Sequence, residues 1–295
     1  MTVLVNLIVA LGMLYAVPAG LRLTDPEGLR TAARLWPWAA VPGALAPWLP
    51  RGAAATALAA LYTVAALLLL GAAGTRLRRH LAAPRTGGGG RLPAPAEVAV
   101  LTALVSPSVA AAALVAERGG HRLLGFDLDV LALTVPHFHF AGFTAALVAG
   151  LVCRAEGTGR PARWAAYSVP AGTLLVLLGY FVDDWAELLG ALVLTGGMWA
   201  VALVTWRELR PAVRDRTTRT LLAVSAAVLV VTMLPALWWA AGEATGIVHP
   251  TLAWMAATHG LGNALGFGLC SLLAWRRLSA DRPPAPEPVP ALPFP

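Results

Sequence analysis

Four polar residues lie deep inside apolar stretches of the sequence, where a titratable or amide side chain is costly and therefore a candidate for function. His137 and His139 follow Asp127 by 10 and 12 residues in the stretch DLDVLALTVPHFHFAGF, and His259 and Asn263 lie in WMAATHGLGNALGF. At about 1.5 Å per residue, the first two histidines are roughly 15–18 Å along a helix that begins near Asp127. The second pair is expected at a similar depth.

Neutral imidazole is inexpensive to bury and can donate and accept a hydrogen bond at once, which suits it to proton transfer. His259 and Asn263 are four residues apart and share a helix face. His137 and His139 are two apart, about 200° around a regular helix, so they face one cavity only if Pro136 distorts the helix. We expect one or both of them to converge with His259 and Asn263. The alternative is that each histidine is an interhelical hydrogen-bond partner.

Carboxylates gather where apolar segments end, and two of them are adjacent. The stretch FVDDWAELLG leaves almost no loop to hold Asp183 and Asp184 in bulk water. Adjacent carboxylates raise each other's pKa, so Asp184 is the predicted acid and Asp183 its neighbour. An ordinary helix-connecting turn is the alternative interpretation. Other acids at comparable segment ends are Glu117, Asp127, Asp129, Glu187 and Glu243.

Aromatic side chains could form the wall of a lipophilic pocket. Trp238, Trp239 and Trp254 lie within apolar segments, and Phe143 follows the first histidine pair. Such rings exclude water and stabilise positive charge through cation–π contact. They are predicted substrate-binding residues, with packing against neighbouring helices as the alternative for each.

The elements that carry these residues are predicted from composition and hydropathy. The chain has 295 residues, is 58% hydrophobic and 13% charged, and has a mean hydropathy of +0.70. These values exclude a soluble enzyme, a disordered chain and a disulfide-built domain. They predict an all-α, polytopic transmembrane helical bundle over 1–278 with about nine spans, a glycine-rich hinge at 86–90, and a proline-rich disordered cytoplasmic tail over 279–295. The predicted spans are 2–21, 32–49, 53–74, 95–116, 127–153, 164–182, 187–206, 219–242 and 251–275.

Arginine supplies all 22 basic residues, and its distribution predicts the orientation. With nine spans the connectors alternate between two sides, and 19 arginines fall on one side while only Arg51, Arg118 and Arg122 fall on the other. The positive-inside rule places the rich side in the cytoplasm of a bacterial inner membrane, with the N-terminus outside and the C-terminus inside. The net charge of +7 is thus expected from topology and not from nucleic-acid binding.

The two histidine stretches also carry a family resemblance. VPHFHFAGF (135–143) and THGLGNALGF (258–267) resemble the hallmark runs of the YndJ-like integral membrane family of bacteria, and the resemblance extends over roughly 95–275. It implies a membrane protein and singles out His137, His139, His259 and Asn263. A looser similarity of type exists with small membrane-bound terpenoid cyclases, which open an epoxide by protonation.

Three functional hypotheses follow. The first is an intramembrane enzyme that binds a lipophilic substrate among membrane lipids and performs a proton-initiated cyclisation or isomerisation without a cofactor, since nucleotide motifs and cysteine clusters are absent from the sequence. The second is a metal or haem protein that uses His137, His139 and His259, although the HxH spacing suits one centre poorly. The third is a proton-linked transporter or sensor. The sequence leaves the substrate and the oligomeric state open.

Overall fold

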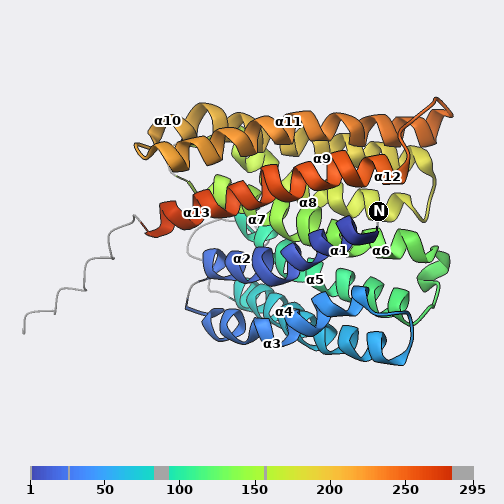
Figure 1. Cartoon of the computed structure of the whole chain (residues 1–295). Coiled ribbons are helices and arrows are strands. Elements are labelled where there is room, and N and C mark those ends of the chain that lie inside the picture. Colours follow the sequence, from blue (N-terminus) through green and yellow to red (C-terminus); the bar gives the residue numbers. More distant parts are fainter. Residues whose placement is uncertain (1, 26, 83–92, 156–157, 281–295) are drawn as a thin grey trace, which may run out of the picture.

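The computed structural model describes residues 2–25, 27–82, 93–155 and 158–280. Over these residues the chain forms nine helical runs that lie side by side, with no strand (Figure 1). Several runs contain a wider π-helical turn; these turns and the short 3₁₀ turns are both labelled η. The runs are α1–η1–α2 (Thr2–Leu11, Gly12–Ala16, Val17–Thr24), α3 with the 3₁₀ turn η2 (Arg30–Leu45, Ala46–Trp48), α4 (Ala53–Ala82), α5 (Pro95–Arg118), α6–η4–α7 (Leu128–His137, Phe138–Thr144, Ala145–Arg154), α8 (Arg160–Gly179), α9–η5–α10 (Asp184–Val204, Thr205–Leu209, Arg210–Ala212), α11 (Arg216–Thr245) and α12–η6–η7–α13 (Leu252–Met255, Ala256–Gly260, Gly262–Leu269, Cys270–Ala280). The short 3₁₀ turn η3 (Leu123–Gly125) precedes α6.

Each predicted span corresponds to one of these runs, and the predicted all-α membrane bundle is confirmed. Six runs are long and apolar enough to cross a membrane by length and composition. The remaining three are those of α3, α8 and α12–α13. Helices also continue past the apolar stretches: the third span, predicted to end at residue 74, is helical to Ala82, because arginine is a good helix former even where hydropathy falls.

Two predicted boundaries need correction or fall outside the described residues. The sixth span was expected to run to residue 182, but α8 ends at Gly179. Asp183 instead caps the next helix, accepting a 2.7 Å hydrogen bond from the Ala186 N–H, so the aspartate pair begins α9. The 86–90 segment and residues 281–295 of the tail lie outside the described residues, and α13 continues to Ala280, two residues beyond the expected end of the bundle.

The connectors meet at two opposite ends of the bundle. At the arginine-poor end, Arg51 pairs with Glu117 at 2.9 Å, and the buried Arg118 pairs with Glu117 and donates to the Leu49 carbonyl at 2.9 Å. Asn6 donates to the Pro47 carbonyl there at 3.1 Å. These contacts join the start of α1, the α3–α4 connection and the end of α5.

At the arginine-rich end, a second network joins the other connectors. Arg76 contacts both Asp25 and Glu97, and Arg154 lies 3.5 Å from Glu97. These side chains come from α4, the α2–α3 connection, α5 and α7. Consecutive runs that alternate in direction place these four segments at the same end of the bundle, as the predicted nine-span order requires.

The α8–α9 hairpin is packed closely enough to set the positions of the side chains on α9. A Cβ on Gly179 would lie 2.5 Å from the Glu187 backbone, and one on Gly172 would lie 2.4 Å from the Leu194 backbone. Only glycine permits this approach of two backbones. The hairpin thereby fixes which face of α9 is turned toward the rest of the bundle.

Candidate functional site: a lipophilic cavity with a deep polar set

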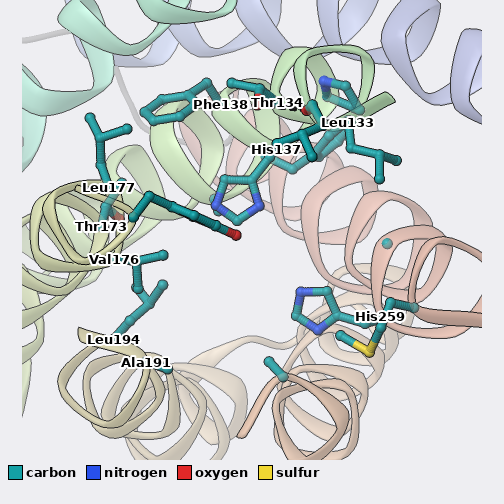
Figure 2. A pocket seen from close by; sticks show the side chains of 18 of the residues that line it. Leu133, Thr134, His137, Phe138, Thr173, Val176, Leu177, Ala191, Leu194 and His259 are labelled. Carbon is teal, nitrogen blue, oxygen red and sulfur yellow. Dashed lines mark hydrogen bonds between the residues drawn. The ribbon is translucent and has the colours of Figure 1, made fainter. Parts of the chain in front are cut away.

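A cavity of about 870 Å³ lies between α6–η4, α8, α9, α11 and the α12–η7 run. Its wall is mostly aliphatic and aromatic. Figure 2 shows Leu133, Phe138, Val176 and Leu194 around the opening. A space of this size and character is typical of sites for small lipophilic molecules.

His137 and His259 project into this cavity from different helical runs, and Figure 2 shows both imidazoles directed into the same open space. His137 is exposed although it lies in mid-helix, because its ring stands in the cavity. Within the described part of the chain, His137 makes no side-chain hydrogen bond, so both of its ring nitrogens are available to a ligand.

The hydrogen bonds around His259 fix its tautomer. Its Nδ1 lies 2.7 Å from the Thr232 carbonyl oxygen, and since a carbonyl only accepts, Nδ1 carries the proton. Nε2 is then the basic nitrogen. Asn263 lies within 3.3–3.4 Å of the ring nitrogens through Nδ2, and its Oδ1 accepts from the Thr232 hydroxyl at 2.8 Å. An oriented imidazole whose basic Nε2 is next to the Asn263 amide and the cavity is an arrangement suited to general acid–base catalysis.

A glycine makes the His259 arrangement possible. A Cβ on Gly262 would lie 2.6 Å from Cγ2 of Thr232. Without that Cβ, η7 approaches α11 closely enough for the His259 ring to reach a backbone carbonyl of the neighbouring helix. Gly262 and Gly266, which both approach α11, therefore set the distance between the two helices at this site.

π-Helical turns flank both cavity histidines. η4 begins directly after His137, and η6 contains His259. Pro136 removes one backbone donor just before η4. Such turns are frequent at functional sites because they redirect side chains within one helix.

His139 faces away from the cavity and is fully buried. Its Nδ1 donates to the Val135 carbonyl at 2.7 Å, and its Nε2 accepts from the Tyr62 hydroxyl at 2.6 Å. The Tyr62 ring in turn meets Trp36 edge-on at 5.6 Å. Both nitrogens of His139 are thus satisfied by the protein, as expected of a residue that joins helices.

This placement separates the three histidines of the predicted metal or haem site. His137 and His259 share the cavity, whereas His139 points into the core beside α4. Among the described residues, no three His, Cys, Asp or Glu side chains lie together in a geometry that could hold a metal ion. The sequence hypothesis of one centre formed by all three histidines does not match this geometry.

The carboxylates that line the cavity are not the predicted aspartate pair. Asp183 and Asp184 are both exposed and do not line the cavity; instead Glu187, one turn further along α9, lines it and is 8% exposed. Glu243 near the end of α11 also lines it. The expected folding of the aspartate connector toward the cavity is therefore wrong. The spacing Glu187–Ala191–Thr195 (i, i+4, i+8) was the available signal, because it predicts one face of a helix.

Of the four aromatic residues predicted to form the wall of a pocket, one lines this cavity. Trp239 lines the cavity. Trp238 does not: it is half exposed and donates through Nε1 to the Val248 carbonyl at 2.8 Å, while Trp254 packs against it with ring centroids 6.3 Å apart. Phe143 is fully buried against Gly20 in the core. The aromatic lining that sequence reasoning missed comprises Phe126, Phe138, Phe140, Tyr180, Phe181 and Phe267.

Thr195 is a further polar residue of the cavity. It is 2% exposed, and its Oγ1 is buried with no hydrogen-bond partner among the described residues. Buried hydroxyls are usually paired, so an unpaired one that lines a cavity indicates a place for a ligand atom. We call His137, Thr195, His259 and Asn263 the deep polar set.

Long apolar helices around a lipophilic cavity, with charged side chains concentrated at the two ends, define a polytopic helical membrane protein. The model of the YndJ-like protein family matches residues 7–267, and the chain belongs to that family. It is 27% identical over 156 residues to the "Uncharacterized membrane protein YndJ" of Bacillus subtilis (strain 168); the match covers 52% of this chain and 28% of that protein. The chain therefore aligns with less than a third of the relative's length. No solved structure matches the chain.

Proposed function

We propose that this protein is an intramembrane enzyme that catalyses a proton-initiated isomerisation or cyclisation of a lipophilic substrate. The observation that carries the proposal is the pair of cavity histidines: His137, which has no hydrogen-bond partner among the described residues, and His259, whose Nδ1 donates to the Thr232 carbonyl. Two imidazoles in one apolar cavity can supply a proton at one point and accept one at another.

The chemistry is balanced without an external oxidant or reductant. A protonated imidazole gives a proton to an alkene, epoxide or carbonyl of the substrate, the electron pair of that bond accepts it, and the other imidazole removes a proton from a neighbouring carbon as the new bond forms. The substrate is rearranged with no change in its composition. Asn263 orients His259, and the aromatic wall excludes water and stabilises positive charge during the rearrangement.

The proposal includes the location of the protein. We infer a bacterial cytoplasmic membrane, with membrane lipid around the bundle, the N-terminus outside and the C-terminus inside, because the connectors on one side carry 19 of 22 arginines. Single cysteines at positions 184 and 214, in a chain whose Cys153 and Cys270 are replaced, should react with a membrane-impermeant thiol reagent from the outside and the inside respectively. Labelling of both from one side contradicts the orientation.

The experiment for the activity does not require a known substrate. Purified protein is incubated with a lipid extract of its host in deuterium oxide, and the lipids are analysed by high-resolution mass spectrometry. Proton-initiated rearrangement places a solvent deuteron on carbon whenever the protonated atom is carbon, so a labelled lipid should accumulate with the wild-type protein.

The matched control is His259→Gln, which retains hydrogen-bonding capacity but cannot shuttle a proton near neutral pH. We expect the label to be absent with this variant. A label that forms equally with the variant, or no rearranged or labelled lipid at all with wild-type protein over a complete host extract, contradicts the proposal.

A further inference from the structure

Two carboxyl side chains line the cavity in addition to the deep polar set. Glu187 lies one turn into α9 and Glu243 lies near the end of α11, both at the arginine-poor end. Tyr180, at the end of α8, lines the same cavity. The residues that line the cavity include no arginine. This part of the cavity therefore combines carboxyl side chains with an otherwise apolar wall.

The two carboxylates differ in what balances them. Glu243 lies 2.9 Å from Nε2 of His249, whose ring packs against Trp239 with centroids 4.7 Å apart. Glu187 has no cationic partner among the described residues, although it is 8% exposed. A carboxylate buried in this way is costly unless a positive charge or several donors meet it. A ligand in the cavity can supply both.

The unpaired hydroxyl of Thr195 is an independent sign of a ligand in the same cavity. It lies eight residues beyond Glu187 on the same face of α9, which is about 12 Å along the helix axis. Between them the wall is apolar, with Ala191 and Leu194 on α9 and Val176 opposite on α8 (Figure 2). The cavity thus has polar groups at two levels separated by hydrocarbon.

We propose that the ligand is a long-chain lipophilic amine, whose ammonium group is bound by Glu187 and Glu243 and whose far end carries an oxygen that accepts from Thr195. The inference rests on the proposed function, because it identifies the substrate class of that same cavity. Tyr180 and Trp239 add aromatic surfaces that favour an ammonium group over a neutral one. The reacting group is then held beside His137 and His259.

The test compares three probes with one carbon chain: dodecylamine, dodecanol, and dodecylamine with a hydroxyl at its far end. Binding to the purified full chain is measured by native mass spectrometry after release from detergent. We expect the wild-type protein to bind dodecylamine about tenfold more tightly than dodecanol, and the hydroxylated amine more tightly still. Glu187→Gln should abolish the preference for amine and leave dodecanol binding unchanged. Thr195→Val should abolish only the gain from the hydroxyl.

The matched control is Asp184→Asn, which removes the same charge three residues away from an exposed position outside the cavity. It should retain the amine preference, which excludes general attraction to an acidic surface. Equal binding of amine and alcohol by the wild-type protein overturns the amine class while leaving proton-transfer chemistry intact. Absence of binding by all three probes overturns this inference, and the deuterium experiment then decides the proposed function separately.

Discussion

His137 and His139 lie two residues apart in one helical run. The His137 side chain projects into the cavity, whereas the His139 side chain lies in the core. His137 is accessible and has no side-chain hydrogen bond within the described part of the chain. His139 is fully buried, with one ring nitrogen donating to the Val135 carbonyl and the other accepting from Tyr62. The same residue type, two positions apart, therefore meets opposite requirements for hydrogen bonding.

The difference teaches how to interpret a polar residue inside a membrane span. A buried histidine whose nitrogens are both occupied stabilises the contact between helices, because breaking either bond leaves an unsatisfied polar atom. A histidine with free nitrogens beside a cavity contributes little to stability and remains available for chemistry. Depth and residue type are the same for both, so neither can separate the two roles.

The largest expected effect is on activity, when either of the histidines that line the cavity is replaced. His137→Gln or His259→Gln should lower formation of the deuterium-labelled lipid by 100-fold or more, about 2.7 kcal/mol, because general acid–base groups typically contribute at least that much. For His137→Gln the midpoint of thermal unfolding in detergent should stay near that of wild type, whereas His259→Gln also loses the contact with the Thr232 carbonyl and should unfold at a somewhat lower temperature. If unfolding shifts strongly while the rate per folded molecule is unchanged, these histidines are structural.

Substitutions around the buried His139 should show the reverse: a loss of stability without a loss of activity per folded molecule. Tyr62→Phe removes the hydroxyl that meets His139 Nε2 at 2.6 Å and leaves that nitrogen buried and unpaired. We expect a loss of about 1–3 kcal/mol in stability, measured as a lower unfolding midpoint, with normal product formation by the folded fraction. A Tyr62→Phe protein of normal stability that forms no product would instead place His139 in the chemistry.

A smaller effect on activity is expected at Thr232, whose hydroxyl holds Asn263 and whose backbone carbonyl orients His259. Thr232→Val removes the 2.8 Å hydrogen bond to Asn263 Oδ1 but keeps the backbone carbonyl that orients His259. Loss of one hydrogen bond of about 1 kcal/mol corresponds to roughly a fivefold slower reaction. A decrease as large as that for His259→Gln would mean that Asn263 takes part directly.

The smallest expected change is in the stability of Thr195→Val, and it is opposite in sign to the change expected for Tyr62→Phe. Thr195→Val replaces a buried, unpaired hydroxyl by a methyl group, so the unfolding midpoint should be unchanged or higher by the equivalent of up to about 1 kcal/mol. A clear destabilisation in the ligand-free protein would show that the hydroxyl has a protein partner in solution, and would remove it from the set of ligand contacts.

Hydropathy was sufficient to predict the bundle, because a helix that crosses a membrane needs about 20 consecutive, mostly apolar residues, and such segments can be recognised in the sequence alone. The arrangement within the cavity depends on the rotation of each helix about its axis. The stretch HFH leaves two histidines open as candidates. The contacts of His139 with Tyr62 on α4 and with Gly12 on η1 distinguish it from His137. Asp184 and Glu187 are three residues apart, which is within the error of a predicted helix boundary. That shift of nearly one turn along the axis still separates an exposed side chain at the start of α9 from a buried one that lines the cavity.

The π-helical turns have a consequence for sequence change in this family. A turn with one additional residue shifts the angular phase of everything that follows by about 100° relative to a regular α-helix. In the last run, deletion of one residue within η7 would rotate α13 against α12. Trp275, now buried, and Arg277, now 3.2 Å from Asp215, would then leave their partners while His259 kept its own. Insertions and deletions in these spans should therefore occur in compensating pairs, and single ones should be found chiefly in the connectors.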